Sequence, residues 1–238
     1  MLGKTFRLCA WLLGLSLLAC GATGQHELTF PVRAVGTAPR TLTVADWQVT
    51  LERAEVGLGP IYFCATAAID PELCRTAVAD FAQSAKVNLL EPAPQTLGEG
   101  FGVTAEIRGM SFDYGLSWLT TQGEVTPAAS APDGHSAVLV GRATRGATTF
   151  RFTANIDVTP LRQGGRGVNG LATQVTLADG ASFTLRFDPY AWLAGVSFDE
   201  LAALGGDPVV VPSSSRAYSA IVAAMTASAP PVAQWSVP

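Results

Sequence analysis

Apolar and polar residues alternate strictly along several segments, and this period of two constrains the fold more than any other feature. From Phe150 to Val158 every second residue is apolar and the residues between are polar. The same alternation occurs over residues 103–107 and 183–187. Because successive side chains of a β-strand point to opposite faces, each segment predicts a strand with one face in the core. Further strands are predicted over residues 29–35, 47–56, 59–63, 86–90, 136–143 and 172–178.

Short turn signals separate these strands. An Arg-Gly pair at 145–146 divides two of them, and Asp179-Gly180 is typical of a two-residue hairpin. The apolar face of the strand over 47–56 changes register, which predicts a β-bulge near residues 52–53. Adjacent strands with short connections pair in the antiparallel direction. We therefore predict a mainly β fold, either an antiparallel β-sandwich or a small barrel.

Helical segments are predicted between and after the strands. Asp70 and Pro71 are typical of a helix N-terminus, and apolar residues on one face extend this helix to Phe81. Capping patterns predict short helical turns over 188–195 and 197–205. A C-terminal helix is predicted before Pro230-Pro231 from one apolar stripe, made of Tyr218, Ile221, Val222 and Met225.

Composition excludes two classes of protein. The chain has 238 residues, of which 48% are hydrophobic, too many for a disordered chain. Its formal net charge of −4 argues against binding to nucleic acid. The length fits one large domain, and no repeat suggests a second. Residues 28–238 are therefore predicted to form a single β-rich domain with a C-terminal helix.

The N-terminus is predicted to be a secretory signal. Lys4 and Arg7 precede an apolar run over 8–19, which is shorter than the roughly 20 residues that span a membrane. The run ends in Leu17-Leu18-Ala19-Cys20-Gly21, which resembles the lipobox of bacterial lipoproteins. Ordinary signal cleavage nearby, for example after Ala22, is the alternative interpretation.

The lipobox resemblance implies the processing and the location of the chain. Residues 1–19 would be removed as the signal peptide, Cys20 would carry the lipid, including palmitate, and residues 20–27 would form a tether. Gly21 follows the cysteine, where Asp tends to retain lipoproteins at the inner membrane. The resemblance therefore implies an outer-membrane lipoprotein of the cell envelope, held by its N-terminal lipid.

Cys64 and Cys74 remain after these assignments. A pair left over in an exported protein is most simply a disulfide, which would join the predicted helix to the strand ending at Cys64. A redox or metal-binding pair is the alternative, although the spacing is not CxxC and no histidine lies near in the sequence.

Residues for catalysis or metal binding are sparse. The chain has two histidines, His26 in the tether and His135 after a turn, and both are expected to be solvated. His135 is the weak metal candidate, together with Met110 or a carboxylate. A hydrolase would have to use Ser111 with His135, because no other histidine lies in the body of the domain.

Aromatic side chains are the remaining candidates for a binding site. Tyr114 and Trp118 flank Gly115 between predicted strands, and of the aromatic residues they are the best candidates for an exposed pair that contacts a ligand, although placement in the core is favoured. Trp47 is expected in the core, and Trp192 is expected to close one end of the domain.

Three longer motifs resemble uncharacterised β-rich surface lipoproteins of Gram-negative bacteria. Some members of that group are thought to take part in metal acquisition at the cell surface, a role for which this chain has few histidines. The motifs are Trp47-x-Val49-x-Leu51-x-x-Ala54-x-Val56-x-x-Gly59-Pro60-x-Tyr62, then Asp188-Pro189-x-x-Trp192-Leu193-x-x-Val196-x-Phe198, and Ala217-Tyr218-x-Ala220-Ile221.

Together these features favour an outer-membrane-anchored lipoprotein whose β domain is non-catalytic and has a binding or structural role. Its expected partners are the membrane, through the lipid, and an envelope protein or a small ligand, without a cofactor and without nucleic acid. A metal-handling periplasmic or surface protein is the first alternative, and a hydrolase is the second.

Overall fold

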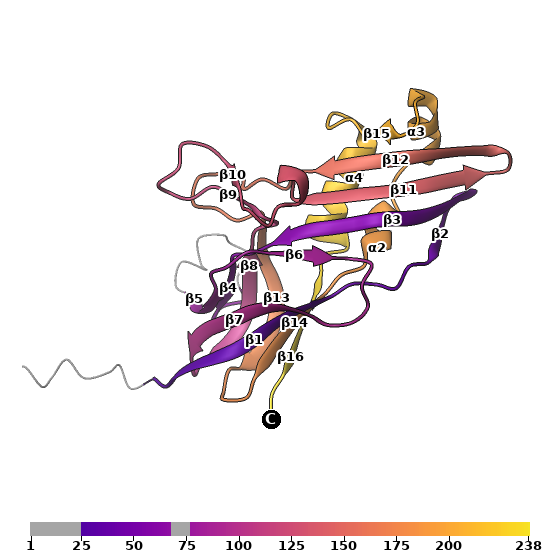
Figure 1. The fold of residues 1–238 in the computed structure, drawn as a ribbon. Coiled ribbons are helices and arrows are strands. Elements are labelled where there is room, and N and C mark those ends of the chain that lie inside the picture. The colour runs from indigo at the N-terminus through magenta and orange to yellow at the C-terminus, as the bar shows by residue number, and fades with distance from the viewer. Residues whose placement is uncertain (1–24, 68–76) are drawn as a thin grey trace, which may run out of the picture.

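The computed structural model describes residues 25–67 and 77–238, and its strands form two large sheets (Figure 1). The first sheet has eight strands, most of them antiparallel. In spatial order they are β13 (Val168–Thr176), β8 (Glu106–Phe112), β4 (Ile61–Cys64), β5 (Ala77–Phe81), β7 (Gln95–Val103), β1 (Glu27–Val35), β14 (Ser182–Arg186) and β16 (Val232–Ser236).

The two edges of this sheet meet, so the eight strands form a nearly closed barrel. β13 and β16 lie in contact although they are the outermost strands of the order. The indole Nε1 of Trp235 on β16 donates a hydrogen bond of 3.1 Å to Oγ1 of Thr173 on β13. Closure protects strand edges that would otherwise present unpaired backbone groups. The predicted mainly β fold with a C-terminal helix is confirmed, with the barrel as its first sheet.

The second sheet projects from the barrel as a long, twisted layer (Figure 1). Its strands are β15 (Val209–Val210), β12 (Thr148–Ile156), β11 (Ala137–Arg145), β3 (Trp47–Leu58) and β2 (Thr41–Val44), with β6 (Ala85–Asn88) paired to the other end of β3. Val140 pairs with Arg53 and Gly141 pairs with Leu51, so Glu52 is the extra residue of a bulge. The predicted bulge is therefore confirmed. β9 (Leu116–Ser117) and β10 (Thr126–Pro127) pair with each other as a separate two-stranded antiparallel ribbon.

Short helices cover one face of the second sheet (Figure 1). They are α2 (Pro189–Leu193), α3 (Phe198–Leu204), α4 (Arg216–Ala223) and the π-helical turn η4 (Ala224–Ser228), while η3 (Pro132–Gly134) is a separate 3₁₀ turn before β11. Three of them begin at side chains that accept a backbone N–H: Asp188 before α2, Ser197 before α3 and Ser215 before α4. The predicted helical turns and the C-terminal helix are confirmed. No helix within residues 25–67 and 77–238 is long and apolar enough to cross a membrane.

One hydrophobic core runs through both sheets and the helices. Trp47 and Trp192 are buried in it, as predicted. Inside the barrel, the rings of Phe30, Phe63 and Phe183 lie 4.7–5.3 Å from the ring of Trp235. Aromatic rings that meet edge-on or tilted add stabilisation beyond the area they bury.

Two predicted elements are wrong. Residues 77–81 form strand β5, not the end of a helix, because Ala79 and Phe81 face the barrel interior while the backbone pairs with β4 and β7. The rest of that predicted helix, residues 70–76, lies outside the described residues. The alternation over 103–107 is not one strand either, since β7 ends at Val103 and β8 begins at Glu106.

The hairpin predicted at Asp179-Gly180 is also wrong. β14 pairs with β1 in the parallel direction and with β16 in the antiparallel direction, so it does not pair with β13. β16 was not predicted, and it lies between β13 and β14 in the barrel wall. The dipeptide makes a turn, but the strand after the turn crosses to a different partner.

Candidate functional site

Of the candidate aromatic pair, Tyr114 is fully buried, which is the core placement that the sequence favoured. Its side chain is 0% exposed, its ring packs edge-on against Phe112 at 5.0 Å, and its hydroxyl donates to the Met225 carbonyl at 3.0 Å. Burial raises the pKa of Tyr114 well above its usual value. Trp118 is half-buried, and its Nε1 donates to the Gln122 carbonyl at 3.3 Å. These two side chains therefore do not form a joint surface for a ligand.

His135 is half-buried and lies beside a single carboxylate. Its Nδ1 lies 2.9 Å from Oδ1 of Asp157, so the ring that was expected to be solvated is only partly exposed and has one fixed partner. Met110 is buried in the barrel interior. Among residues 25–67 and 77–238, no three His, Cys, Asp or Glu side chains are arranged to hold a metal ion.

The pair required by the hydrolase alternative is not hydrogen-bonded in the described structure. Ser111 is buried on β8, and its Oγ accepts a hydrogen bond of 3.3 Å from the Gly170 backbone N–H. His135 is paired with Asp157 instead. His26, the other histidine, is exposed, as its place in the predicted tether suggested. It pairs with exposed Asp179 at 3.2 Å.

The predicted lipidation and disulfide involve residues outside the described part. Cys20 and Cys74 both lie there, so the lipid attachment and the Cys64–Cys74 pairing stay predictions. Cys64 itself is the last residue of β4 and is 4% exposed.

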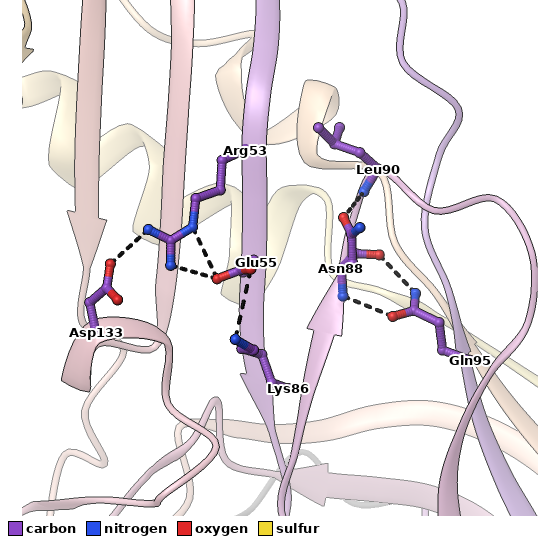
Figure 2. Close-up of polar contacts among 7 residues, drawn as sticks. All are labelled: Arg53, Glu55, Lys86, Asn88, Leu90, Gln95 and Asp133. Carbon is purple, nitrogen blue, oxygen red and sulfur yellow. Dashed lines mark hydrogen bonds and ion pairs between the residues drawn. The ribbon is translucent and has the colours of Figure 1, made fainter.

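A network of charged side chains covers the outward side of the second sheet, the side away from the helices (Figures 1 and 2). Nε and Nη2 of Arg53 both donate to Oε2 of Glu55, at 3.1 and 2.6 Å, and its Nη1 donates to Oδ2 of Asp133 at 2.8 Å. Lys86 Nζ lies 3.9 Å from Glu55 Oε1. Figure 2 shows Arg53 between the two carboxylates, with Lys86 arriving from β6.

Hydrogen bonds to the carboxylates set the electrostatics of Arg53. The bonds to Asp133 and Glu55 raise the pKa of Arg53, and in return the Arg53 guanidinium lowers the pKa of Asp133. Asp133 belongs to η3 and Glu55 to β3, so this ion pair joins two segments distant in the sequence.

A second cluster on the same side has two arginines and one carboxylate. Arg142 of β11 and Arg151 of β12 lie directly opposite each other. Like charges opposite each other on a sheet are destabilising. Glu52 lies between them, with its two carboxylate oxygens 3.6 Å from Arg142 Nη2 and 3.2 Å from Arg151 Nη2. The bulge makes this possible, because it leaves both Glu52 and Arg53 on the outward side.

We call these two clusters together the charged face. Its members are Glu52, Arg53, Glu55, Lys86, Asp133, Arg142 and Arg151. Next to it, a reciprocal pair of hydrogen bonds between Asn88 and Gln95, 2.9 and 2.8 Å long, fixes the end of β6 (Figure 2). The charged face was not predicted from the sequence, although the predicted bulge at residues 52–53 lies within it.

A charged group beside the barrel, Asp113 after β8, is buried and not exposed like the charged face. Asp113 is 0% exposed, and its two oxygens accept hydrogen bonds of 2.8 Å from the Gly167 N–H and the Ser117 hydroxyl. Arg166 Nη1 lies 3.7 Å from Asp113, and its guanidinium stacks over the Tyr62 ring at 4.3 Å. Burial raises the pKa of Asp113, against the opposing effect of these partners. This cluster ties the loop before β13 to the end of β8 and has a structural role.

The fold and the charged face define a class: a mainly β protein with a nearly closed barrel and an appended open sheet that presents charge. No protein-family model matches the chain, and no curated protein matches it. Among solved structures it is similar to MbnP from Methylosinus trichosporium, with 10% sequence identity and a TM-score of 0.35. The match covers 79% of this chain and 81% of that one. At these values the similarity assigns no function to this chain.

Proposed function

We propose that this chain is an outer-membrane lipoprotein that binds an acidic partner protein of the cell envelope through its charged face and catalyses no reaction. The barrel would lie next to the lipid anchor, and the second sheet would present the charged face away from it. The lipobox at Leu17–Gly21 supports the anchor. β1 begins at Glu27, where the predicted tether over 20–27 ends, so the anchor would join the barrel directly.

The charged face is the observation that carries the binding role. It has four cationic and three anionic side chains, whereas the whole chain is negative, with a formal net charge of −4. A local positive excess on an acidic protein favours a negatively charged partner and disfavours nucleic acid as a general ligand. Arginine is enriched at protein interfaces because its planar guanidinium binds carboxylates with two hydrogen bonds.

The geometry of the second sheet supports the same role. Figure 1 shows the β11–β12 hairpin at the end of the molecule away from the start of β1. The charged face lies on rigid strands, which hold side chains in position better than loops do. A partner would therefore meet a preorganised set of charges.

Changing Cys20 to Ala tests the anchor. The variant should be found in the soluble fraction of the cell envelope, and the wild type should take up labelled palmitate in the membrane fraction. Cys9→Ala is the matched control, because Cys9 lies in the predicted signal and should leave labelling unchanged. If Cys20→Ala stayed in the membrane fraction and the wild type took up no palmitate, the anchor would be refuted.

Metal handling is the second candidate, favoured by the 2.9 Å contact between His135 and Asp157. Imidazole and carboxylate together suit several divalent metals. Stoichiometric metal in protein purified without chelator, lost in His135→Ala, would support this candidate. Metal-free protein with unchanged stability in His135→Ala would reject it.

A further inference from the structure

A cavity of about 440 Å³ lies where the barrel meets the helices, remote from the charged face in the sequence and on different strands. Its size is within the usual range for small-molecule sites, about 300–1,000 Å³. The residues that matter here are Arg186, Ala191, Ala229, Pro230, Val232 and Gln234. They come from β14, α2, the segment after η4, and β16.

Arg186 is the polar centre of this cavity, and it has no anionic partner among the described residues. It is exposed at the end of β14, and its guanidinium makes no ion pair or hydrogen bond with the described residues. Nearly all other arginines of this part of the chain are paired, for example Arg40 with Asp188 and Arg108 with Glu106. A guanidinium that lines a cavity and pairs with no carboxylate among the described residues is suited to bind an anion.

Asp188 is the carboxylate in the lining, and it is paired with Arg40 rather than with Arg186. Its Oδ1 accepts the Tyr190 N–H at 3.0 Å, which caps α2, and its Oδ2 accepts from Arg40 at 3.0 Å. Asp188 would lose these bonds if it turned towards Arg186. Arg186 therefore remains a cation without an ion-pair partner among the described residues.

Gln234 adds a second polar group next to Arg186. Val232 pairs with Arg186 and Gln234 pairs with Thr184, so Gln234 and Arg186 are diagonal neighbours on the outward side of the barrel. Diagonal neighbours on a sheet lie close enough for long side chains to reach one ligand. The Gln234 amide makes no hydrogen bond with the described residues, so it remains able to donate one.

Apart from Thr37 and Asp188, the rest of the lining is apolar or glycine. Val232 is 58% exposed although it lines the cavity, and Ala191, Ala229 and Pro230 form a further apolar part of the wall. The Ala229 carbonyl accepts the Trp192 Nε1–H at 3.0 Å, which fixes this wall against the core. A ligand that fits must therefore have a charged end and an apolar part.

We propose that this cavity is a binding site for an organic anion with a short alkyl chain, such as an alkyl carboxylate. Arg186 and Gln234 would hold the anionic group, and Ala229, Pro230 and Val232 would contact the alkyl chain. Alkyl carboxylates and alkyl phosphates share this chemistry, and a lipid fragment or a free organic acid would supply it. This site does not depend on the lipid anchor or on the charged face.

The test is calorimetric titration of the full chain carrying Cys20→Ala, which removes the need for detergent, with four probes. Octanoate and octyl phosphate have the anion and the chain, inorganic phosphate has the anion alone, and octyltrimethylammonium has the opposite charge. We expect octanoate to bind more tightly than inorganic phosphate, and octyltrimethylammonium not to bind. Octyl phosphate binding far more tightly than octanoate would identify a lipid-type phosphate as the source, and the reverse would identify a free carboxylic acid.

Arg186→Gln should weaken octanoate binding about 10- to 100-fold, as expected for the loss of a charge-assisted hydrogen bond. Arg33→Gln is the matched control: Arg33 lies on neighbouring β1 opposite Thr184, makes no ion pair with the described residues, and does not line the cavity. It should change the affinity less than about twofold, since only distant charge is lost. Equal loss in both variants, unchanged binding in Arg186→Gln, or no binding of octanoate and octyl phosphate would overturn the proposal.

Discussion

The strands of the barrel and of the second sheet both alternate apolar and polar residues, but the barrel region has a buried charged side chain whereas the second sheet has exposed ones. The barrel closes around aromatic rings and holds the carboxylate of Asp113 at 0% exposure. The second sheet leaves one side open and places Glu52, Arg142 and Arg151 on it. Charge in a closed, dry space is costly and must be satisfied by fixed partners, whereas charge on an open sheet is screened and remains able to meet a partner. The comparison links the barrel to stability and leaves the charged face open to the partner that we propose for it.

The largest effect is expected from removing an aromatic ring inside the barrel. Trp235→Ala should lower the free energy of unfolding by about 3–5 kcal/mol, because the cavity it leaves is lined by three phenylalanine rings and the bond to Thr173 is lost. Urea unfolding measures this. Trp118→Ala is the control. Trp118 is half-buried like Trp235, but it packs against no aromatic ring of the described residues and makes one hydrogen bond, to a loop carbonyl, so its loss should cost under about 1.5 kcal/mol. Similar losses in both variants would remove the distinction between the barrel and the surface.

The buried carboxylate of the barrel should make stability fall as the pH rises. The pKa of Asp113 is raised in the folded state, so folding binds its proton more tightly than the unfolded chain does. The stability of the wild type relative to Asp113→Asn is therefore greatest below the unfolded value of about 4, and it declines as the pH rises through the folded pKa. Urea unfolding from pH 4 to pH 8 measures the difference, and a difference independent of pH would contradict the burial argument.

Asp133 of the charged face should change stability with pH in the opposite direction. Arg53 lowers the pKa of Asp133, so its contribution is present above the unfolded value and is lost as the pH falls through the folded pKa. Asp133 is exposed, so the effect should be smaller than that of Asp113 and weaker in high salt. The check is acid unfolding of the wild type and Asp133→Asn at two salt concentrations. A dependence of the same sign as that of Asp113 would show that the two regions do not differ in this way.

Local patterns in the sequence predicted much of the fold. The hairpin of β11 and β12, the bulge beside Glu52 and the caps at Asp188 and Ser197 all depend on neighbouring residues, and each is present. Closure of the barrel was not predictable in this way. β14 pairs with β1, far away in the sequence, and β16 is short and follows two prolines. Strand order of this kind depends on burial across the whole fold. A short segment of sequence carries no information about it.

The candidate site was predicted less well than the fold. Tyr114 was a candidate for an exposed position because it lies beside a glycine between predicted strands. Its hydroxyl instead donates to the carbonyl of Met225, a partner that the sequence does not reveal. The charged face depends on residues of β3, β6, β11, β12 and η3 that only the folded sheet brings together. Arg186 of the cavity stands out because it has no ion-pair partner among the described residues, and this too requires the structure.

The most direct test of the charged face uses poly-L-glutamate as an acidic probe. The wild type should bind it with an affinity that falls as salt rises, and the double variant Arg142→Gln/Arg151→Gln should bind at least about fivefold more weakly, because the charge excess is lost. Both proteins should unfold at nearly the same urea concentration, since exposed ion pairs contribute about 0–1 kcal/mol. Arg33→Gln on the barrel should bind like the wild type. Equal binding by all three proteins would contradict the assignment of binding to the second sheet.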